Sequence, residues 1–257
     1  MKSALTLFFT TLGLLALTAR AEPTLYLIGD STVKNSTKDL QGWGTPVAAL
    51  FDPTKIVVEN AALGGRSSRS YLREGLWAKV EAKLKPGDFV LMQFGHNDGG
   101  PIDEGRARAS IKGNGEETKD VTIKETGAAE TVRSYGWYLR QTIAGAQAKG
   151  ATAIVLSPVP RNIWHEGKVA RAANDYGKWA AEAAKAGGAL FIDLNEIVAA
   201  RYEAVGQEKV QAEFFTAADH THTTPAGAAV NAECVVEGIR ALAACPLRDT
   251  LAGKVGP

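Results

Sequence analysis

Five short apolar runs alternate along the chain with longer segments of helical spacing, and this alternation limits the folds open to it. The runs are rich in β-branched and aromatic residues, as buried strands are, and they occupy residues 25–29, 55–59, 89–94, 151–156 and 189–193. Helices are predicted at residues 47–51, 71–84, 131–149, 169–185, 194–205, 208–215 and 225–244. Apolar strands that alternate with helices form a parallel sheet covered on both faces. With right-handed crossovers and the usual doubly wound order, the pattern predicts an α/β fold, a three-layer α/β/α sandwich with a five-stranded parallel sheet and flavodoxin-like topology.

The first residues have the features of a targeting signal. Lys2 gives a positive start, residues 4–17 are apolar, and residues 19–21 form a small-x-small cleavage site. The apolar stretch is short for a permanent membrane span, so a secretory signal peptide is favoured over an uncleaved anchor. We therefore expect a signal peptide over residues 1–21, a single mature domain over residues 22–257, and a secreted or periplasmic protein.

The charge balance bears on the class of partner. The sequence has 29 Lys and Arg against 28 Asp and Glu, and removing the expected signal leaves 27 against 28. This near neutrality argues against a dedicated nucleic-acid binder, which normally has a basic excess. No later apolar run is long enough to span a membrane, so we expect no membrane partner after signal cleavage. We expect the mature protein to be a monomer.

The chain has two cysteines, Cys234 and Cys245, although an exported protein could form disulfides. If both lie on the last predicted helix, eleven residues separate them by roughly 16 Å, which is beyond disulfide reach. We therefore expect two unpaired or buried thiols, with a bridge open to them only if the helix ends before Cys245.

One long segment, residues 99–129, interrupts the alternation of strands and helices. It is rich in glycine and charged residues, and a small hairpin through residues 121–123 is compatible with its sequence. A loop of this length inside a compact domain is usually either functional or disordered.

Residues with catalytic chemistry follow the ends of several predicted strands. The first strand ends in Gly29-Asp30-Ser31, the second is followed by Gly64-Gly65, and the third by Gly95-His96-Asn97; Asp219-His220-Thr221-His222 precedes the last helix. The carboxyl ends of parallel strands meet at one edge of the sheet, where ligands bind in open α/β folds. We therefore expect these stretches to form one site.

Ester hydrolysis through an acyl-enzyme needs a nucleophile, a base and a group that orients the base. We assign these catalytic roles to Ser31, His222 and Asp219, because imidazole exchanges protons near neutral pH and Asp219 lies within one turn of chain of it. Taken singly, Ser31 could be a turn serine, His222 a surface histidine and Asp219 a loop cap. His220 is a rival base, but its side chain is expected to point away.

The negative oxygen that develops during acyl transfer needs hydrogen-bond donors. Gly65 lacks a Cβ, so its backbone N–H can approach that oxygen closely, and the Asn97 amide offers a neutral donor. Together with the Ser31 backbone N–H they form the predicted oxyanion hole. The alternative is that Gly65 and Asn97 merely form turns.

These residues match a known family. Gly29-Asp30-Ser31, Gly65, Gly95-His96-Asn97 and Asp219-x-x-His222 correspond, in order, to the four conserved blocks of the SGNH (GDSL-type) hydrolases. A closer resemblance, to the rhamnogalacturonan acetylesterase group of carbohydrate esterases, runs through residues 29–33, 65–67 with 69–70, 95–98, 136–140, 160–162 and 219–223. The resemblance implies the roles given above for the triad and the oxyanion hole. It implies neither a metal nor an organic cofactor.

Three residues are candidates for substrate binding. Arg73, which follows Arg66 and Arg69, could pair with the carboxylates of galacturonate units, because guanidinium forks suit carboxylates. Trp164 could stack on sugar rings and His165 could line the cleft. Each also has a plain structural interpretation: loop bonding for the arginines, packing for the tryptophan and solvation for the histidine.

Together, residues and resemblance predict a secreted serine esterase that removes acetyl groups from a plant cell-wall polysaccharide, foremost the rhamnogalacturonan of pectin. Its partner would be an acetylated polysaccharide or oligosaccharide. An alternative keeps the chemistry and changes the substrate, to acetylated xylan or oligosaccharides or to the esters of a lipase or thioesterase. Another is a carbohydrate-binding protein without turnover, in which Ser31 would not react with an organophosphate probe.

Overall fold

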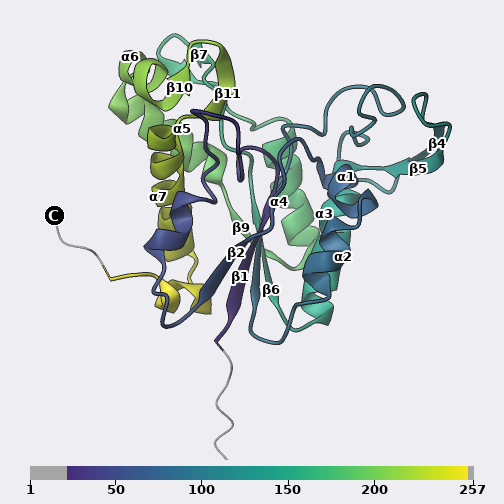
Figure 1. The fold of residues 1–257 in the computed structure, drawn as a ribbon, viewed down its shortest axis with the longest axis horizontal. Helices are drawn as coiled ribbons and strands as arrows, with labels where there is room; N and C mark the ends of the chain where they lie inside the picture. Colours follow the sequence, from purple (N-terminus) through teal and green to yellow (C-terminus); the bar gives the residue numbers. More distant parts are fainter. Residues whose placement is uncertain (1–21, 254–257) are drawn as a thin grey trace, which may run out of the picture.

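The central sheet has five parallel strands and is seen edge-on in Figure 1. The structure, a computed structural model, describes residues 22–253, so the expected signal peptide lies outside the described residues. The strands are β1 (Thr24–Gly29), β2 (Val57–Asn60), β3 (Phe89–Gln93), β6 (Thr152–Leu156) and β9 (Leu190–Ile192). Their order, β2-β1-β3-β6-β9, is the predicted flavodoxin-like order, and all five correspond to the predicted apolar runs.

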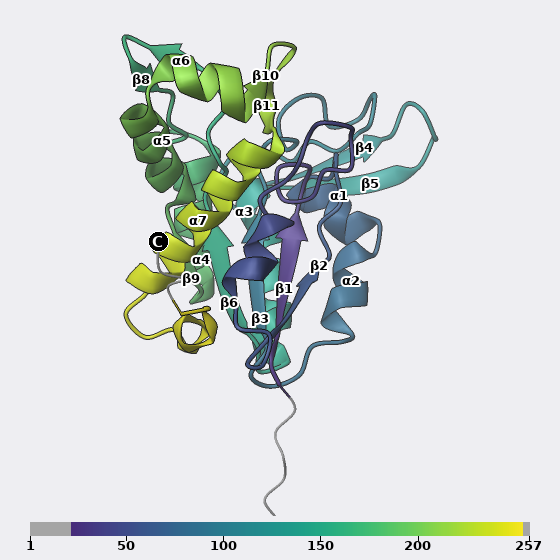
Figure 2. The same ribbon diagram turned by 60° about the vertical axis from the view of Figure 1, so that its left-hand side comes forward.

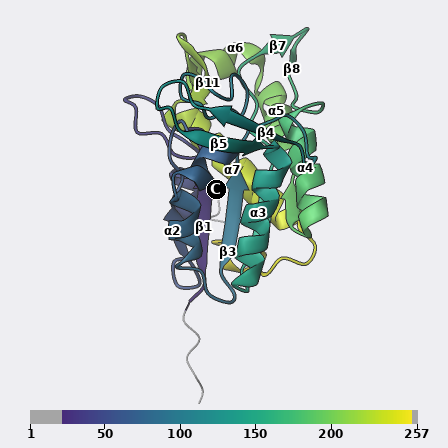
Figure 3. The ribbon, with the colours of Figure 1, turned by 90° about the vertical axis from the view of Figure 1, so that its right-hand side faces the viewer.

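Helices cover both faces of this sheet and complete the predicted sandwich. One face carries η1 (Pro46–Leu50), α5 (Leu194–Val205) and α7 (Pro225–Ala241), which lie in front in Figure 2. The other carries α1 (Ser68–Arg73), α2 (Leu76–Glu81), α3 (Tyr135–Ala148) and α4 (Tyr176–Gly187). Figure 3 shows α2 and α3 across that second face. Leu25 and Leu27 enter the first core and Tyr26 and Ile28 the second, which is why the strand is apolar throughout.

Most of the remaining elements gather at the end of the sheet where the strands finish. Three of them are two-stranded hairpins: β4 (Thr118–Thr122) with β5 (Ala129–Arg133), β7 (Trp164–His165) with β8 (Lys168–Val169), and β10 (Phe215–Thr216) with β11 (Asp219–Thr223). The others are the short helix α6 (Gln207–Lys209) and a short π-helix, η2 (Val210–Phe214). In Figure 1 the β4–β5 and β10–β11 hairpins stand on opposite sides of this end. No helix within residues 22–253 is long and apolar enough to cross a membrane.

Several predicted helices are shorter than the sequence pattern indicated. The helix predicted at 71–84 is two helices, because Gly75 adopts a left-handed backbone (φ +68°) that ends α1. The helix predicted at 131–149 begins only at Tyr135, where Ser134 caps it, since Val132 belongs to strand β5. The helix predicted at 169–185 begins at Tyr176, and most of the one predicted at 208–215 is the π-helix η2.

The two cysteines remain unpaired. Helix α7 ends at Ala241, so Cys245 does lie beyond it, immediately before the short helix η3 (Pro246–Thr250). Both thiols are nevertheless free and buried in the core on the α7 side of the sheet. Burial raises the pKa of both, that of Cys234 to about 12, which keeps the thiols protonated and unreactive.

Candidate active site

The structure brings Ser31, His222 and Asp219 into one hydrogen-bonded chain. Ser31, just after β1, donates its hydroxyl to His222 Nε2 across 2.7 Å. His222 Nδ1 donates to Asp219 Oδ2, also across 2.7 Å. Burial raises the pKa of Asp219, but bonds from the His222 backbone and ring and from the Thr221 backbone outweigh it and hold that pKa below its ordinary value. An ionised Asp219 keeps the proton on Nδ1, which leaves Nε2 free to accept the serine proton.

Strand β11 carries both the histidine and the aspartate, and it is tied to the loop that follows Ser31. The Gln41 N–H donates to the Thr223 carbonyl across 2.8 Å, and the Thr223 hydroxyl donates back to the Gln41 carbonyl across 2.9 Å. Thr224 then caps α7 by accepting from the Gly227 N–H. The proposed base is therefore held near the serine by the two contacts between Thr223 and Gln41, and its strand is fixed at the start of α7 by the Thr224 cap.

The turn that presents Ser31 is held from below by a buried carboxylate. Asp30 Oδ1 accepts from the Thr32 N–H at 2.8 Å and the Thr32 hydroxyl at 2.7 Å, and Oδ2 lies 3.4 Å from His96 Nδ1. Burial raises the pKa of Asp30, but His96 and the hydrogen bonds from Thr32 outweigh this effect and hold the pKa below its ordinary value. The aspartate of this block supports the turn and does not line the groove.

Gly65 and Asn97, the predicted oxyanion residues, lie beside Ser31. Gly65 has a left-handed backbone (φ +78°), and a Cβ on the adjacent Gly64 would lie 3.5 Å from the Ser31 Cβ. Within residues 22–253, neither the Ser31 N–H nor the Gly65 N–H donates a hydrogen bond. Asn97 Nδ2 donates one hydrogen to the Arg66 carbonyl across 2.9 Å and keeps its second hydrogen. Three donors are thus available where acyl transfer develops a negative oxygen.

The three triad residues and the two oxyanion candidates line one open groove of about 570 Å³; they are Ser31, Asp219, His222, Gly65 and Asn97. Its remaining wall comes from the loop after Ser31 and from the segment between β3 and β4, which contributes Arg106 and Arg108. The sequence analysis missed both arginines. The available signal was the stretch Gly105-Arg106-Ala107-Arg108, two close cations inside a long loop that follows a catalytic block.

The comparisons with known proteins agree with this geometry. The family model described as the GDSL-like Lipase/Acylhydrolase family matches residues 27–230, a span that includes all five residues. The chain belongs to this family. It is accordingly a carboxylic ester hydrolase, and the predicted family resemblance is confirmed.

Named relatives of this GDSL-like hydrolase come from fungi and bacteria. It is 35% identical to a rhamnogalacturonan acetylesterase of Emericella nidulans over 84% of each chain. It is 32% identical to the probable rhamnogalacturonan acetylesterase YesY of Bacillus subtilis, over 88% of this chain and 96% of the relative.

Solved structures share the fold. Protein YxiM of Bacillus subtilis matches with a TM-score of 0.69 and 25% identity, and 85% of this chain is aligned but only 56% of YxiM. Axe2, an acetylxylan esterase from Geobacillus stearothermophilus, matches with a TM-score of 0.53 over 84% of this chain and 94% of Axe2. At 17% identity, the likeness to Axe2 concerns the fold alone.

The three substrate-binding candidates do not line the groove of this GDSL-like hydrolase. The guanidinium of Arg73 donates to the Ala107 carbonyl at 2.7 Å and to Glu130 at 3.2 Å, so structural partners occupy it. Trp164 packs against the core and donates its indole N–H to Asn162 Oδ1. His165 is exposed on the β7–β8 hairpin. None of the three lines the groove that contains Ser31, and their role in substrate binding stays a prediction.

His220 is likewise separate from the groove. Its exposed side chain lines a different hollow with Asn162 and Gln211, and its carbonyl accepts from the Asn162 N–H. No hydrogen bond within the described part of the chain connects its ring to Ser31, so His222 is the better placed base.

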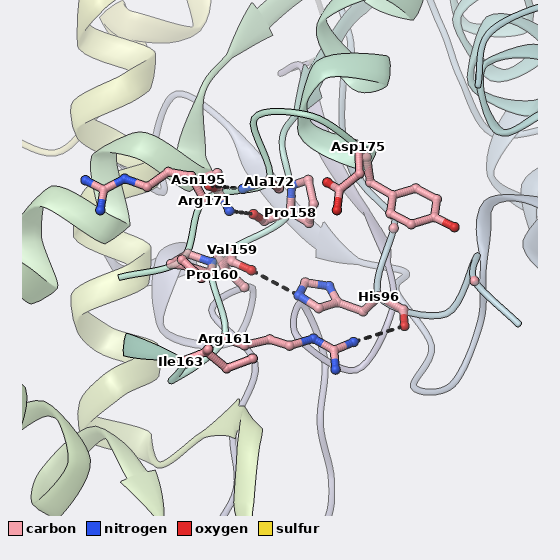
Figure 4. A pocket seen from close by; sticks show the side chains of 14 residues that line it. His96, Pro158, Val159, Pro160, Arg161, Ile163, Arg171, Ala172, Asp175 and Asn195 are labelled. Carbon is pink, nitrogen blue, oxygen red and sulfur yellow. Dashed lines mark hydrogen bonds between the residues drawn. The ribbon is translucent and has the colours of Figure 1, made fainter. Parts of the chain in front are cut away.

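A second cavity, of about 300 Å³, lies behind the third catalytic block (Figure 4). His96 Nε2 points into it and donates to the Val159 carbonyl across 3.0 Å, and Arg161 reaches the His96 carbonyl. Asn195 braces the far wall by donating to the Pro158 carbonyl. The cavity contains neither Ser31 nor His222, so its lining supports the loop that carries Asn97.

A metal site would need several converging ligands. Among residues 22–253, no group of three or more His, Cys, Asp and Glu side chains is arranged to hold a metal ion.

Proposed function

We propose that this GDSL-like hydrolase is a carbohydrate acetylesterase that acts on acetylated rhamnogalacturonan. The observation that carries the proposal is the hydrogen-bonded chain from Ser31 through His222 to Asp219, open to a groove with three free donors beside the serine. The substrate class is supported by two relatives named as known or probable rhamnogalacturonan acetylesterases, each aligned over more than four fifths of this chain.

In the first half of the proposed reaction, Ser31 Oγ attacks the acetyl carbonyl carbon while His222 Nε2 takes the serine proton. Asp219 stabilises the resulting imidazolium through Nδ1–H. The carbonyl oxygen becomes an oxyanion that accepts from the N–H groups of Ser31 and Gly65 and from the Asn97 amide. The bond to the sugar oxygen then breaks, and His222 returns the proton to that oxygen, which frees the sugar hydroxyl.

The second half releases acetate. Water enters the groove, His222 Nε2 accepts one of its protons, and the water oxygen attacks the acetyl carbonyl of acetyl-Ser31. The same three donors stabilise the second oxyanion. Collapse of this intermediate breaks the bond to Ser31 Oγ, which takes the proton back from His222.

We also propose that the protein is exported and acts outside the cytoplasm as a monomer. The support is the sequence of residues 1–21, with its positive start, apolar stretch and small-x-small site. N-terminal sequencing of the protein from the medium or periplasm should give Glu22 as the first residue, and light scattering should give the mass of one mature chain. A cell-associated protein that begins at Met1 would overturn the export proposal.

The test of function is acetate release by the wild type and by Ser31→Ala. The substrates are acetylated rhamnogalacturonan, acetylated xylan and a small chromogenic acetate. Ser36→Ala is the matched control, because Ser36 lines the same groove without bonding to His222. We expect release from rhamnogalacturonan that Ser31→Ala lowers by at least about 1,000-fold and Ser36→Ala leaves unchanged.

Other results of the acetate-release test would favour a different substrate or a different function. Serine-dependent release from xylan or the small ester alone would keep the mechanism and reject the pectic substrate. No release from any ester, with no labelling of Ser31 by an organophosphate, would favour a carbohydrate-binding protein without turnover.

A further inference from the structure

We infer that Arg106 and Arg108 form a subsite for a sugar carboxylate directly beside the proposed oxyanion hole. The ligand would be a uronate unit that neighbours the acetylated sugar in an acidic polysaccharide. This inference rests on the proposed function and extends it from the acetyl group to the charge of the polymer.

Both guanidinium groups lie against the loop that carries a proposed oxyanion donor. Arg108 Nη1 donates to the Gly65 carbonyl across 2.9 Å. A Cβ built on Gly65 would lie 2.9 Å from Arg106 Nη1 and 3.5 Å from Arg108 Nη1. Both side chains line the groove together with Ser31. A polymer whose acetyl group reaches Ser31 would therefore pass next to both arginines.

Neither cation forms an ion pair with another residue in the described part of the chain. Within residues 22–253, Arg106 makes neither a hydrogen bond nor an ion pair. Burial lowers the pKa of Arg108 and the like charge of Arg106 lowers it further, while the buried carboxylates of Asp30 and Asp98 raise it by less. Among the described residues that line the groove, Asp219 is the one carboxylate, and it is occupied by His222 and Thr221. Two close guanidiniums that form no ion pair favour an anionic ligand, and their planar forks match a carboxylate.

The backbone holds the two arginines in an uncommon conformation. Ala107, between them, has a left-handed backbone (φ +43°), which is strained for an alanine. Neighbouring carbonyls are held from α1: Arg73 donates to the Ala107 carbonyl, and the Ser67 hydroxyl donates to that of Arg108. Strain that persists because the surroundings fix it is typical of functional sites. Arg73, which was predicted from the sequence as a substrate-binding candidate, thus holds the segment that presents these two.

The test compares Arg106→Gln with the wild type on substrates of different charge. Arg106 is the better probe, since Arg108 also bonds the Gly65 carbonyl and its loss would disturb the oxyanion loop. Arg240→Gln is the matched control, because Arg240 is exposed near the end of α7, outside the groove. Arg106→Lys asks whether the fork is needed in addition to the charge.

We expect Arg106→Gln to raise KM for acetylated rhamnogalacturonan about tenfold, the loss of one charge-assisted hydrogen bond, with kcat unchanged. KM for acetylated xylan and for the chromogenic acetate should stay at the wild-type value, and Arg240→Gln should change nothing. Methyl esterification of the polymer's carboxylates should raise the wild-type KM by at least the same factor, because it removes the contacts with both arginines. In Arg106→Gln it should raise KM by a smaller factor, because the contact with Arg106 is already lost and only that with Arg108 remains.

An equal rise in KM on xylan and rhamnogalacturonan, or no rise on either, would overturn the subsite. So would additive effects of methyl esterification and Arg106→Gln. If the wild type releases no acetate from acetylated rhamnogalacturonan, the proposed substrate is rejected. Galacturonate oligomers would then test the subsite as inhibitors. Inhibition of chromogenic acetate hydrolysis by these oligomers, relieved in Arg106→Gln but not in Arg240→Gln, supports it; inhibition that is absent or equal in all variants rejects it.

Discussion

At the residue scale, the two oxygens of Asp219 have different partners. Oδ1 accepts from the backbone N–H groups of Thr221 at 2.7 Å and His222 at 2.9 Å, and Oδ2 accepts from the His222 ring. In Asp219→Asn, the two backbone donors keep the amide oxygen in the Oδ1 position. The amide nitrogen must then face His222 Nδ1, which has to accept and so loses its proton to Nε2.

This wrong tautomer cannot take the proton of Ser31. We therefore expect Asp219→Asn to lower kcat on a chromogenic acetate by about 1,000- to 10,000-fold while the fold stays intact. Steady-state kinetics and near-ultraviolet circular dichroism measure the two effects. His220→Gln, on the same strand, should keep full activity, and a comparable loss in that variant would return the role of base to His220.

The environment of Asp98 predicts how the stability of the protein depends on pH. It is fully buried and accepts hydrogen bonds from Ser68 and Ser110. Burial raises its pKa to about 6, against the bonds from the two serines and with a smaller upward contribution from Asp30. The folded protein thus binds this proton more tightly than the unfolded chain, in which aspartate titrates near 4.

Stability should therefore fall as pH rises from about 4 to 6 through this group, and the loss is complete above pH 6. Asp98→Asn is neutral at every pH. We expect the unfolding free energy of Asp98→Asn, relative to the wild type, to increase by up to about 3 kcal/mol between pH 4 and pH 7. Urea unfolding across this range measures the difference, and a constant difference would show that Asp98 titrates at an ordinary pKa.

At the element scale, the segment from β3 to β5 is joined to α1 by a buried ion pair. The Arg69 side chain is fully buried and donates to both oxygens of Glu130, and Arg69 also donates to the carbonyls of Ile102 and Ala109. Burial raises the pKa of Glu130, but Arg69 and Arg73 outweigh it and keep the carboxylate ionised. This contact fixes the loop that carries the two groove arginines.

Glu130→Gln leaves the Arg69 charge buried without a partner. We expect a loss of roughly 1 to 3 kcal/mol in unfolding free energy, less than for a completely buried pair because Glu130 is partly exposed. Amide exchange should increase at residues 102–110 but not in β1, β3 or β6. Glu117→Gln, in the same segment without an ion pair, is the control. Uniformly faster exchange over the whole chain would contradict a local role for the pair.

The success of prediction from sequence also depends on the element. The inner strands β1, β3 and β6 were predicted because they are buried on both sides and read as continuous apolar runs. The edge strands β2 and β9 are less buried, and the β-branched and aromatic residues in their sequences were enough to predict them. Helix starts were less well predicted: Val132 fits the apolar spacing of α3, yet it pairs with Lys119 in the β4–β5 hairpin. The pairing within this hairpin is not visible in the helical periodicity of residues 131–149.

The same distinction holds for the site. Ser31, Gly65 and Asn97 could be predicted because each follows the end of a sheet strand, and the parallel fold alone brings those ends together. The spacing of Arg66, Arg69 and Arg73 placed three cations near the site, but contacts with Glu74, Glu130 and the carbonyls of the long loop occupy them. Arg106 and Arg108 lie outside any periodic pattern, so only the folded loop shows that they reach the groove.

At the scale of the whole molecule, the charges are unevenly distributed although their sum is small. The sequence has nearly equal numbers of acids and bases, but within the described residues the groove is lined by Lys34, Arg106 and Arg108 against Asp219 alone. Net charge therefore describes the solubility of the protein and not its substrate. A near-neutral hydrolase can still attract an acidic polymer at the place where its acetyl groups would be removed.

The central sheet and the long loop after β3 also contribute different residues to the groove. The proposed acyl transfer uses residues at the ends of β1, β2 and β3 and on β11, whereas the two groove arginines belong to a segment that contributes no strand to the central sheet. A lineage could lengthen, shorten or recharge that segment without altering the reaction itself, provided that a contact equivalent to Arg108 with the Gly65 carbonyl is kept. Grafting it onto a relative that lacks it is then a route to new polymer preference, and a family with one chemistry could diversify across many plant polysaccharides by varying this single insert.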